Sequence, residues 1–527
     1  MNWLVPLIVL VPLLGAAITL TAARRQRLQI ILASITMVLA LGISIALLVV
    51  VHTQDQALVI QVGGWAAPFG ISLVVDRLSA LLVLVTSVVL IAVMAFSIGQ
   101  GAADGDEETP VSIFYPTYLV LAAGVYNAFI AGDLFNLYVG FEILLVASFV
   151  LITLGGTASR IRAGVTYVVV SLISSILFLV SIAMVYASVG TVNMAEISTR
   201  MPEVDENVQL LIHLMLLIAF GIKAALFPLS FWLPDSYPSA PAPVTAVFAG
   251  LLTKVGVYAI LRTESLLFAD NDISILLIVV SIFTMLVGIL GAVAQAGIRR
   301  MLSFTLVSHI GYMIFGIALG TELGWAATVY YIMHHILVQT TLFLVTGLIE
   351  RIAGTSTLTH LGGMFARAPY VAVLFFIPLL NLGGIPPFSG FIGKIALFVA
   401  GAEGTTLQVP QPLVWVAIGV GAATSLLTLY ALIRVWNLGF WRSEEEIEDH
   451  DSQLTEHLEE APGADVVEEQ KDNSMLMNIA TTAMVAITIA MTVFAGPIID
   501  IADDASEQLR SPTGYVSGVQ DEEGIKP

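Results

Sequence analysis

Apolar runs long enough to cross a lipid bilayer recur along almost the whole chain, and they restrict the fold more than any other feature. A bilayer core about 30 Å thick needs about 20 mostly apolar residues per helix, and such runs are too long for the strands of a sandwich or a barrel. The sequence therefore predicts an all-α integral membrane protein with about 14 transmembrane helices, at residues 2–21, 28–51, 72–98, 111–130, 133–156, 163–187, 207–229, 243–263, 272–293, 299–319, 325–348, 370–400, 413–441 and 475–499.

Composition excludes a water-soluble fold. Of the 527 residues, 58% are hydrophobic and 11% are charged, whereas about 25% of residues are charged in soluble domains. The absence of cysteine excludes disulfides, cysteine-ligated iron–sulfur clusters and zinc ribbons. The chain also lacks a phosphate-binding loop, a serine nucleophile elbow and an HExxH zinc motif. We therefore expect no cofactor, no metal and no enzymatic active site in this chain.

Most of the net charge of −19 lies in two stretches. Residues 443–472 hold thirteen acidic groups and one lysine, and residues 500–527 hold seven acidic groups and two basic ones. We interpret residues 442–473 as a solvated cytoplasmic linker and residues 474–527 as a last span followed by a solvated acidic tail. A docking or ion-concentrating role is the alternative for the linker. No basic surface suggests a nucleic acid as partner.

Basic loop residues predict the orientation of the spans. With the N-terminus outside, the cytoplasmic loops carry most of the arginines, and the even number of spans returns the C-terminus to the outside. The first span has no basic residue before it and arginines after it, which is the wrong order for a cleaved signal peptide. We expect a multi-pass protein of the cell membrane with both termini outside. The cytoplasmic arginines would be Arg24, Arg25, Arg27, Arg160, Arg162, Arg299, Arg300, Arg351, Arg367 and Arg442.

Four ionisable residues lie inside apolar spans: Glu142, Lys223, Lys254 and Lys394. A charge at the bilayer centre costs about 2.5–3.5 kcal/mol on insertion scales, and more if it faces lipid. Static pairing between helices is one explanation, but Glu142 is the one clear carboxylate for three lysines. A relay is the other explanation, and the one we favour. A buried amine without a partner is easily deprotonated, and neighbouring amines can then pass a proton along.

Two of the lysine-bearing spans are interrupted. Pro228 follows Lys223 by five residues, and the glycines and prolines of GGIPPFSGFIGK (383–394) precede Lys394. At membrane depth, such breaks are tolerated where they line a cavity or pack inside protein. Ordinary proline kinks are the alternative, but they leave the accompanying lysines unexplained.

Broken seventh and twelfth helices, five spans apart, are typical of inverted-repeat transporters. We therefore expect one repeat at 111–263, with spans 4–8, and a second at 272–441, with spans 9–13. An N-terminal segment of three helices at 1–110 would precede them.

Several histidines could extend a proton path between the lysines. His309 lies in the tenth predicted span, and His334 and His335 lie in the eleventh. Histidine titrates near neutrality and can shuttle protons, although each ring could equally be a hydrogen-bonded packing group. Adjacent residues point about 100° apart on a helix, so at most one of His334 and His335 is expected to face the path. His213 is a weaker candidate, and Arg262 and Glu264 are expected to be interfacial anchors.

The sequence resembles the proton-translocating antiporter-like family, which includes the large membrane subunits of respiratory complex I and of Mrp-type multisubunit cation/proton antiporters. The resemblance covers essentially the whole chain in colinear order. Within the family, the amino-acid sequence is most similar to that of D-type Mrp subunits. The matching segments are VDRLSALL (75–82), DLFNLYVGFEIL (133–144), KAALFPLSFWLPDSYPSAPAPVTAVFAGLLTKVGVYAILR (223–262), RRMLSFTLVSHIGYM (299–313) and GGIPPFSGFIGK (383–394).

The resemblance assigns roles to the buried charges. It implies that Glu142 is the fifth-helix glutamate that pairs with Lys223, that Lys254 is the central relay lysine, and that Lys394 is the lysine nearest the exit. It also implies that the chain works in a hetero-oligomer with other antiporter subunits, with H⁺ and Na⁺ as substrates. The short C-terminus, without a long lateral helix, favours a D-type Mrp component.

Three functions remain open at this point. The first is a non-redox proton-translocating subunit of a sodium/proton antiporter. The second is a membrane arm of a redox enzyme, such as complex I or a membrane-bound hydrogenase, in which the same lysines pump protons. The third is a scaffold whose buried charges only hold helices together.

If the relay hypothesis is correct, Lys223→Ala or Glu142→Ala should abolish antiport, because either change removes a member of the proton path. Sodium-dependent proton movement in membrane vesicles would measure this, with co-purification of the complex as the control for assembly. Normal exchange by an assembled variant would contradict the assignment.

Overall fold

The computed structural model describes residues 2–101, 111–268, 272–404, 409–443, 446 and 464–520. Among these residues, 13 helices are long and apolar enough to cross a membrane. The predicted span at 370–400 is divided into two shorter apolar helices, α16 (Pro369–Gly383) and α17 (Ser389–Ala402). The predominantly helical membrane fold expected from the sequence is therefore confirmed. The linker predicted at 442–473 lies largely outside the described residues.

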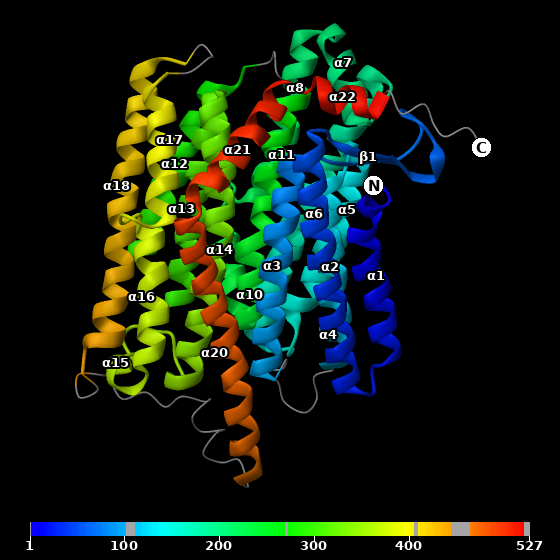
Figure 1. The fold of residues 1–527 in the computed structure, drawn as a ribbon. Helices are drawn as coiled ribbons and strands as arrows, with labels where there is room; N and C mark the ends of the chain where they lie inside the picture. Colours follow the sequence, from blue (N-terminus) through cyan, green and yellow to red (C-terminus); the bar gives the residue numbers. More distant parts are fainter. Residues whose placement is uncertain are drawn as a thin grey trace.

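The remaining spans follow the predicted order (Figure 1). The continuous helices are α1 (Leu4–Thr21), α2 (Gln26–Gln54), α3 (Arg77–Gln100), α4 (Val111–Ile130), α5 (Leu134–Thr153), α6 (Ala158–Val189), α8 (Glu206–Ala224), α12 (Ser274–Val293), α13 (Ile298–Leu319), α14 (Glu322–Ala353) and α20 (Ala464–Val493). The eighth span combines α10 (Ala242–Val247), the π-helical η4 (Phe248–Leu252) and α11 (Thr253–Leu266), and the thirteenth combines α18 (Gln411–Val435) with the π-helical η5 (Trp436–Trp441). The short connecting helices are η1 (Val62–Gly64), α7 (Met194–Arg200), η2 (Met201–Glu203), α9 (Leu233–Ser236), η3 (Tyr237–Ser239) and α15 (Met364–Arg367).

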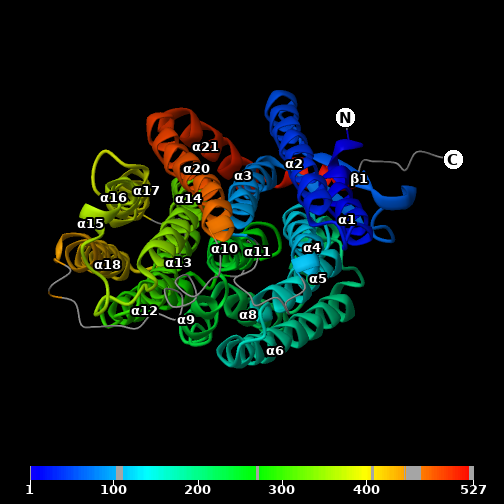
Figure 2. The ribbon, with the colours of Figure 1, turned by 90° about the horizontal axis from the view of Figure 1, so that it is seen from below.

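Helices in the middle of the molecule are enclosed by protein, and those at its edges are not (Figure 2). The span from Ala242 to Leu266 and helix α14 have fully buried apolar windows, whereas one third of the corresponding window is buried in α1, α2 and α18. The exposed side chains of these outer helices are mostly large and apolar, as contact with lipid requires. The outer helices therefore turn large apolar side chains outward, and their buried polar side chains, such as Thr428 of α18, face the protein.

Glycines allow two pairs of helices to approach closely. A Cβ added to Gly124 of α4 would lie 2.5 Å from the backbone nitrogen of Leu144 in α5. A Cβ added to Gly288 of α12 would lie 2.4 Å from the backbone nitrogen of Ser308 in α13. Small residues that bring backbones together are a common way for membrane helices to associate, because burial from water supplies no driving force within lipid.

The third predicted span begins later than expected. Ser72–Val75 forms strand β2, which pairs antiparallel with β1 (Leu58–Gln61), and α3 begins only at Arg77. The side chain of Asp76 accepts a hydrogen bond from the backbone nitrogen of Ser79, which caps the helix. The sequence prediction was wrong here because the β-branched and apolar residues of the strand extend the hydropathy of the helix without a break.

The C-terminal region is packed rather than solvated. Residues 495–510 form α21 (Ala495–Arg510), and α22 (Thr513–Gln520) follows it across the end of the bundle (Figure 1). Ala502, Ala505 and Leu509 are buried, and the hydroxyl of Ser506 donates to the carbonyl of Glu322. The prediction of a solvated tail is therefore wrong for this part, because the acidic residues share amphipathic helices with buried apolar ones. The N-terminus and α22 lie at the same end of the molecule.

The close packing of α12 on α13 gives a test of the fold. Gly288→Ala should destabilise the protein by about 1–3 kcal/mol, because the new methyl group overlaps the backbone of α13. Gly419→Ala in α18 is the matched control, since no heavy atom lies within 4 Å of its added Cβ. Thermal unfolding in detergent should show a lower midpoint for the first variant alone, and equal midpoints would contradict this packing.

Candidate functional site

All three intramembrane lysines are buried, and each lies where its helix is irregular. The exposed fractions are 8% for Lys223, 0% for Lys254 and 3% for Lys394. They lie on α8, α11 and α17, so that three different helices supply them. The described residues therefore contain three amines that are shielded from lipid by protein, as the insertion cost requires.

Lys223 lies at the C-terminal end of α8. The helix stops at Ala224 because Ala225 adopts a left-handed conformation with φ of 60°. The Lys223 amine lies 3.3 Å from both the carbonyl oxygen of Ser171 and the hydroxyl of Ser175 on α6. A small cavity of about 10 Å³, roughly the space for one water molecule, adjoins it.

Glu142 is not in contact with Lys223. Its Oε1 atom is buried and has no hydrogen-bond partner among the described residues, while the Lys223 amine is bonded to α6. The carboxylate lies close enough to act on the amine electrostatically. The pairing implied by the resemblance is therefore a longer-range interaction in this structure, and a carboxylate oxygen remains available for hydrogen bonding.

Lys254 follows the π-helical segment η4. In a π-helix the backbone bonding shifts from i→i+4 to i→i+5, and such bulges are frequent at functional sites. Here the Lys254 amine donates to the carbonyl oxygen of Ala249, five residues earlier, at 2.6 Å. The irregular turn thus supplies a backbone acceptor to an amine that forms no ion pair with a carboxylate of the described residues.

Lys394 uses the break between α16 and α17 in a similar way. Helix α16 ends because Gly384 has φ of 78°, and the carbonyl of Leu382 accepts a hydrogen bond from the Lys394 amine at 2.8 Å. The amine also lies 3.0 Å from the hydroxyl of Ser425, which in turn donates to the carbonyl of Gly383. The broken twelfth span therefore holds the amine through one free backbone carbonyl, and a serine of the thirteenth span supplies the second acceptor.

A cluster of aromatic and imidazole rings lies between Lys254 and Lys394. The Nδ1 atom of His309 lies 2.8 Å from the hydroxyl of Tyr331, and its Nε2 atom lies 3.4 Å from the hydroxyl of Thr428. The rings of His309 and His335 are 5.2 Å apart between centroids. Lys254 and Lys394 are both close enough to act electrostatically on His309 and His335.

Both adjacent histidines belong to this cluster. His335 faces His309, and neither of its ring nitrogens has a hydrogen-bond partner among the described residues. The Nδ1 atom of His334 lies 3.0 Å from the hydroxyl of Ser389, which begins α17 and donates to Asn381. We expected at most one of the two to face a proton path; both rings meet polar neighbours, because α14 is enclosed by protein and two directions from it lead to polar side chains.

Several residues of the site were missed at the level of sequence. Tyr331, Ser389, Ser425 and Thr428 connect the charged groups, but single hydroxyls in apolar spans give no distinctive pattern. His213 lies apart from the cluster and pairs with Glu264 at 2.6 Å.

Arg262 is not an interfacial anchor as expected. It is 3% exposed, and its Nη1 atom lies 2.7 Å from Oδ2 of Asp76. In the sequence, Arg262 follows Lys254 by about two helical turns, and this spacing could have indicated that both side chains lie on the same buried face.

This fold and this site define a class of protein: a polytopic membrane protein with a buried row of titratable side chains beside broken helices. A family model described as "NADH:quinone oxidoreductase/Mrp antiporter, TM" matches residues 131–428, which is more than half of the chain. The chain therefore belongs to the NADH:quinone oxidoreductase/Mrp antiporter membrane family, which confirms the resemblance seen in the sequence.

Curated relatives match most or nearly all of this chain. The chain is 37% identical to the D subunit of a Na⁺/H⁺ antiporter of Alkalihalophilus pseudofirmus, over 98% of this chain and 99% of that one. It is 36% identical to the D subunit of a Na⁺/H⁺ antiporter of Bacillus subtilis, over 85% and 88% of the two chains.

Solved structures give the same result. A chain of the Mrp complex from Dietzia sp. DQ12-45-1b superposes with a TM-score of 0.87 at 30% identity, covering 99% of this chain and 100% of that one. A chain of respiratory complex I from Thermus thermophilus superposes with a TM-score of 0.69 at 20% identity, covering 93% and 98%, which is a likeness of fold alone.

The environment of Lys254 gives a test of whether the amine has a structural role. Lys254→Met should leave the thermal midpoint unchanged or raise it, because it removes a buried charge that makes one hydrogen bond and keeps a similar side-chain volume. Thermal unfolding of the detergent-solubilised protein measures this. A marked loss of stability would indicate that the amine is needed to hold the helices together.

Proposed function

We propose that this chain is a proton-translocating subunit of a multisubunit sodium/proton antiporter in the cell membrane. The observation that carries the proposal is the buried series of exchangeable groups. The rings of His309 and His335 are 5.2 Å apart. The Lys394 amine lies 5.4 Å from the ring of Tyr312, which is 5.5 Å from that of His309. The exchanged ions, sodium and protons, are proposed from its relatives, which are named as D subunits of Na⁺/H⁺ antiporters. The partners would be the other subunits of such a complex.

In this proposal, the proton path begins at Lys223. The next step is to Lys254, on the helix that packs directly against the end of α8: a Cβ added to Gly256 would lie 2.7 Å from the backbone nitrogen of Ala224. Contact this close brings the neighbourhoods of the two lysines together. The small cavity beside Lys223 is also lined by Leu252, two residues before Lys254, and gives room for a water-mediated step.

The second half of the path runs through the ring cluster. His335 has two ring nitrogens without partners among the described residues, so it can accept a proton and release it without breaking an existing hydrogen bond. His309 connects it to Tyr331, and His334 connects Tyr331 to Ser389 at the start of α17. Lys394 ends the series, held by two acceptors that remain in place when it loses its proton.

Glu142 would control the first lysine. A carboxylate that approaches the amine favours the charged form, and one that withdraws favours release of the proton. The separation seen here, with Lys223 bonded to serines and a carboxylate oxygen unpartnered among the described residues, corresponds to a state in which that attraction is weakened. Movement of Glu142 would thus push the proton toward Lys254, and sodium extrusion would be coupled to the resulting proton flow.

We also propose that residues 111–263 and 272–441 are inverted repeats. Helices α4 and α5 meet through Gly124, and α12 and α13 meet through Gly288, at equivalent places in the two halves. Isolated antiparallel bridges also correspond: Asp133 with Asn193 in the first half, and Gly297 with Thr357 in the second. The elements that follow these bridges, α7 and α15, lie at opposite ends of the bundle, as inversion requires (Figure 1).

We propose that the end bearing the N-terminus and α22 faces the outside. The basis is the arginine content of the loops at the other end, which includes Arg24, Arg25 and Arg27 between α1 and α2.

A redox-driven membrane arm is the alternative function. The fold is shared with a chain of an archaeal membrane-bound sulfane sulfur reductase, with a TM-score of 0.85 at 23% identity over 98% of this chain. We favour the antiporter because the more similar chain, at 30% identity, comes from an Mrp complex. The named relatives that match nearly the whole length are antiporter subunits.

The function is tested with the whole complex in liposomes that carry a pH-sensitive dye. An outwardly directed sodium gradient should drive proton movement, and Lys254→Met should remove it while the complex stays assembled. Sodium-independent proton pumping fuelled by electron transfer would support the alternative. Unchanged exchange by the Lys254→Met complex would contradict the relay.

The histidine cluster predicts a graded effect. His335→Gln should lower the rate of exchange at least about tenfold, because general acid–base groups typically contribute 10²–10⁴-fold to the steps they serve. His213→Gln is the matched control, since its ring pairs with Glu264 away from the cluster. Equal rates for the two variants in reconstituted complexes would remove His335 from the path.

A further inference from the structure

A polar pocket at the end of the bundle that bears the N-terminus has no role in the path described above. Its volume is about 610 Å³, and its lining residues come from the end of α2, strand β1, the start of α3 and the helices α21 and α22. Its lining includes Asp55, Asp76, Arg77, Glu507, Gln508 and Tyr515. The pocket is large enough for many water molecules.

The floor of the pocket is a buried ion pair. Asp76 and Tyr515, which both line the pocket, also contact Arg262: the guanidinium lies 2.7 Å from the Asp76 carboxylate and 5.3 Å from the centre of the Tyr515 ring. The Nη2 atom of Arg262 lies 3.3 Å from the hydroxyl of Ser79, and its Nε atom lies 3.4 Å from the hydroxyl of Tyr258. Every guanidinium nitrogen therefore has a partner, and Arg262 contacts two side chains, Asp76 and Tyr515, that line the pocket.

Arg262 and Tyr258 share a helix face with Lys254. Residues four apart lie one above the other on an α-helix, so Lys254, Tyr258 and Arg262 follow one another along α11 over about 12 Å. All three are buried. A line of polar groups thus runs from the pocket toward the central lysine.

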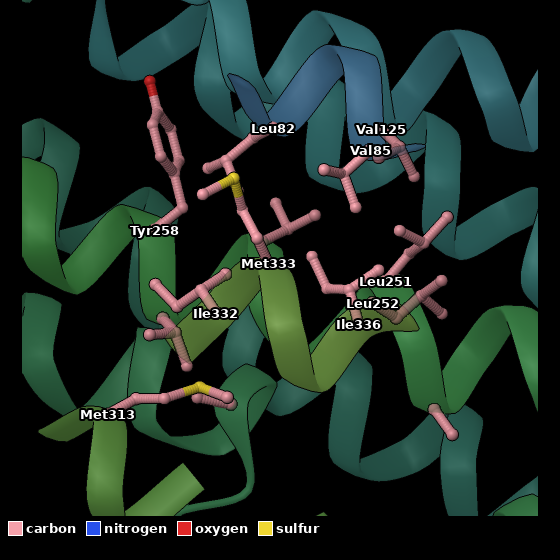
Figure 3. Close-up of a cluster of buried hydrophobic side chains, with 14 of the residues drawn as sticks. Leu82, Val85, Val125, Leu251, Leu252, Tyr258, Met313, Ile332, Met333 and Ile336 are labelled. Carbon is pink, nitrogen blue, oxygen red and sulfur yellow. The ribbon is translucent and has the colours of Figure 1, made fainter. Parts of the chain in front are cut away.

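Apolar side chains pack beside this line. Figure 3 shows Leu82 and Met333 beside the ring of Tyr258 and Ile332 near the base of its side chain, with the hydroxyl pointing away from Ile332. All three of these side chains are at most 3% exposed. Apolar constrictions of this kind exclude water and can gate a path by dewetting.

We propose that the pocket is the outer vestibule of a water route to Lys254, and that the Asp76–Arg262 pair together with the apolar side chains around Leu82 keeps this route closed. The inference rests on the proposed function, in which Lys254 exchanges protons. It adds a second access to the central lysine, and makes Asp76 and Arg262 positioning residues that control it.

The chemistry of the floor suits protons and not sodium ions. Both oxygens of the Asp76 carboxylate already accept a hydrogen bond, one from the backbone nitrogen of Ser79 and one from Arg262, so a dehydrated cation would have to compete with the guanidinium for them. A sodium ion would also have to lose its hydration shell to pass the apolar side chains around Leu82. A proton can instead pass through water and the hydroxyls of Ser79 and Tyr258, which lie 3.5 Å apart.

The absence of cysteine from the chain makes the test direct. Leu82→Cys, in the assembled complex in vesicles, serves as the reporter for a charged, membrane-impermeant thiol reagent added at the outer side. Labelling should be slow in this background. Adding Asp76→Asn with Arg262→Gln, which removes both charges but keeps hydrogen-bonding groups, should accelerate labelling at least tenfold and raise the passive proton leak without a sodium leak.

Glu196→Gln with Arg200→Gln is the matched control, because that ion pair is on the same side of the molecule and its arginine side chain is 42% exposed. It should change neither labelling nor leak. Lys254→Met in the neutralised background should abolish the extra leak if the route ends at this lysine. Unchanged labelling and leak in an assembled neutralised complex would overturn the proposal, and so would an equal leak of sodium.

If the neutralised complex does not assemble, Arg262→Lys provides the second variant, since it keeps the charge and loses part of the hydrogen bonding. It should give intermediate labelling. Failure of this variant to assemble would assign the pair to folding and overturn the proposal. The labelling needs no sodium transport, so it is independent of the proposed function, which fails separately if the unmodified complex exchanges no sodium for protons.

Discussion

The free-energy cost of holding amines inside a membrane governs this structure. Each lysine avoids lipid, and each is stabilised by acceptors rather than by a carboxylate in contact. For Lys254 and Lys394, the acceptor is a backbone carbonyl that a regular α-helix would keep for itself, made available by a π-helical turn or by the break between α16 and α17. Neutral acceptors stabilise the charged amine without fixing its proton, which is what a relay needs.

The histidines, like the lysines, lie among polar neighbours inside the protein, because the central helices are buried. Because α14 is surrounded by protein, side chains on different faces of this helix can all reach polar neighbours. His334 and His335 therefore serve two different sides of one cluster. The outer helices α1, α2 and α18 face lipid with apolar side chains, so the polar row depends on the whole bundle to keep lipid away from it.

The sequence was sufficient to predict the spans and the buried lysines. Hydropathy summed over 20 residues is a strong signal, and a lysine within such a stretch stands out. It was insufficient for short or amphipathic elements. Strand β2 was absorbed into the helix that follows it, and the acidic residues of α21 concealed its buried apolar side. Arg262 was misjudged because the end of a span normally lies at the membrane surface, whereas here β1, α21 and α22 gather at that end of the bundle.

By itself, the sequence determined that the chain is a helical membrane protein, where its spans lie, and which helices are broken beside lysines. These are local properties, set by the hydrophobic effect and by the geometry of proline and glycine. Only the tertiary structure decided which groups meet: the separation of Glu142 from Lys223, the engagement of both adjacent histidines and the Asp76–Arg262 pair. Contacts between distant segments depend on how helices pack and rotate against one another, and one chain's residue order does not encode these angles in any pattern that can be read along it.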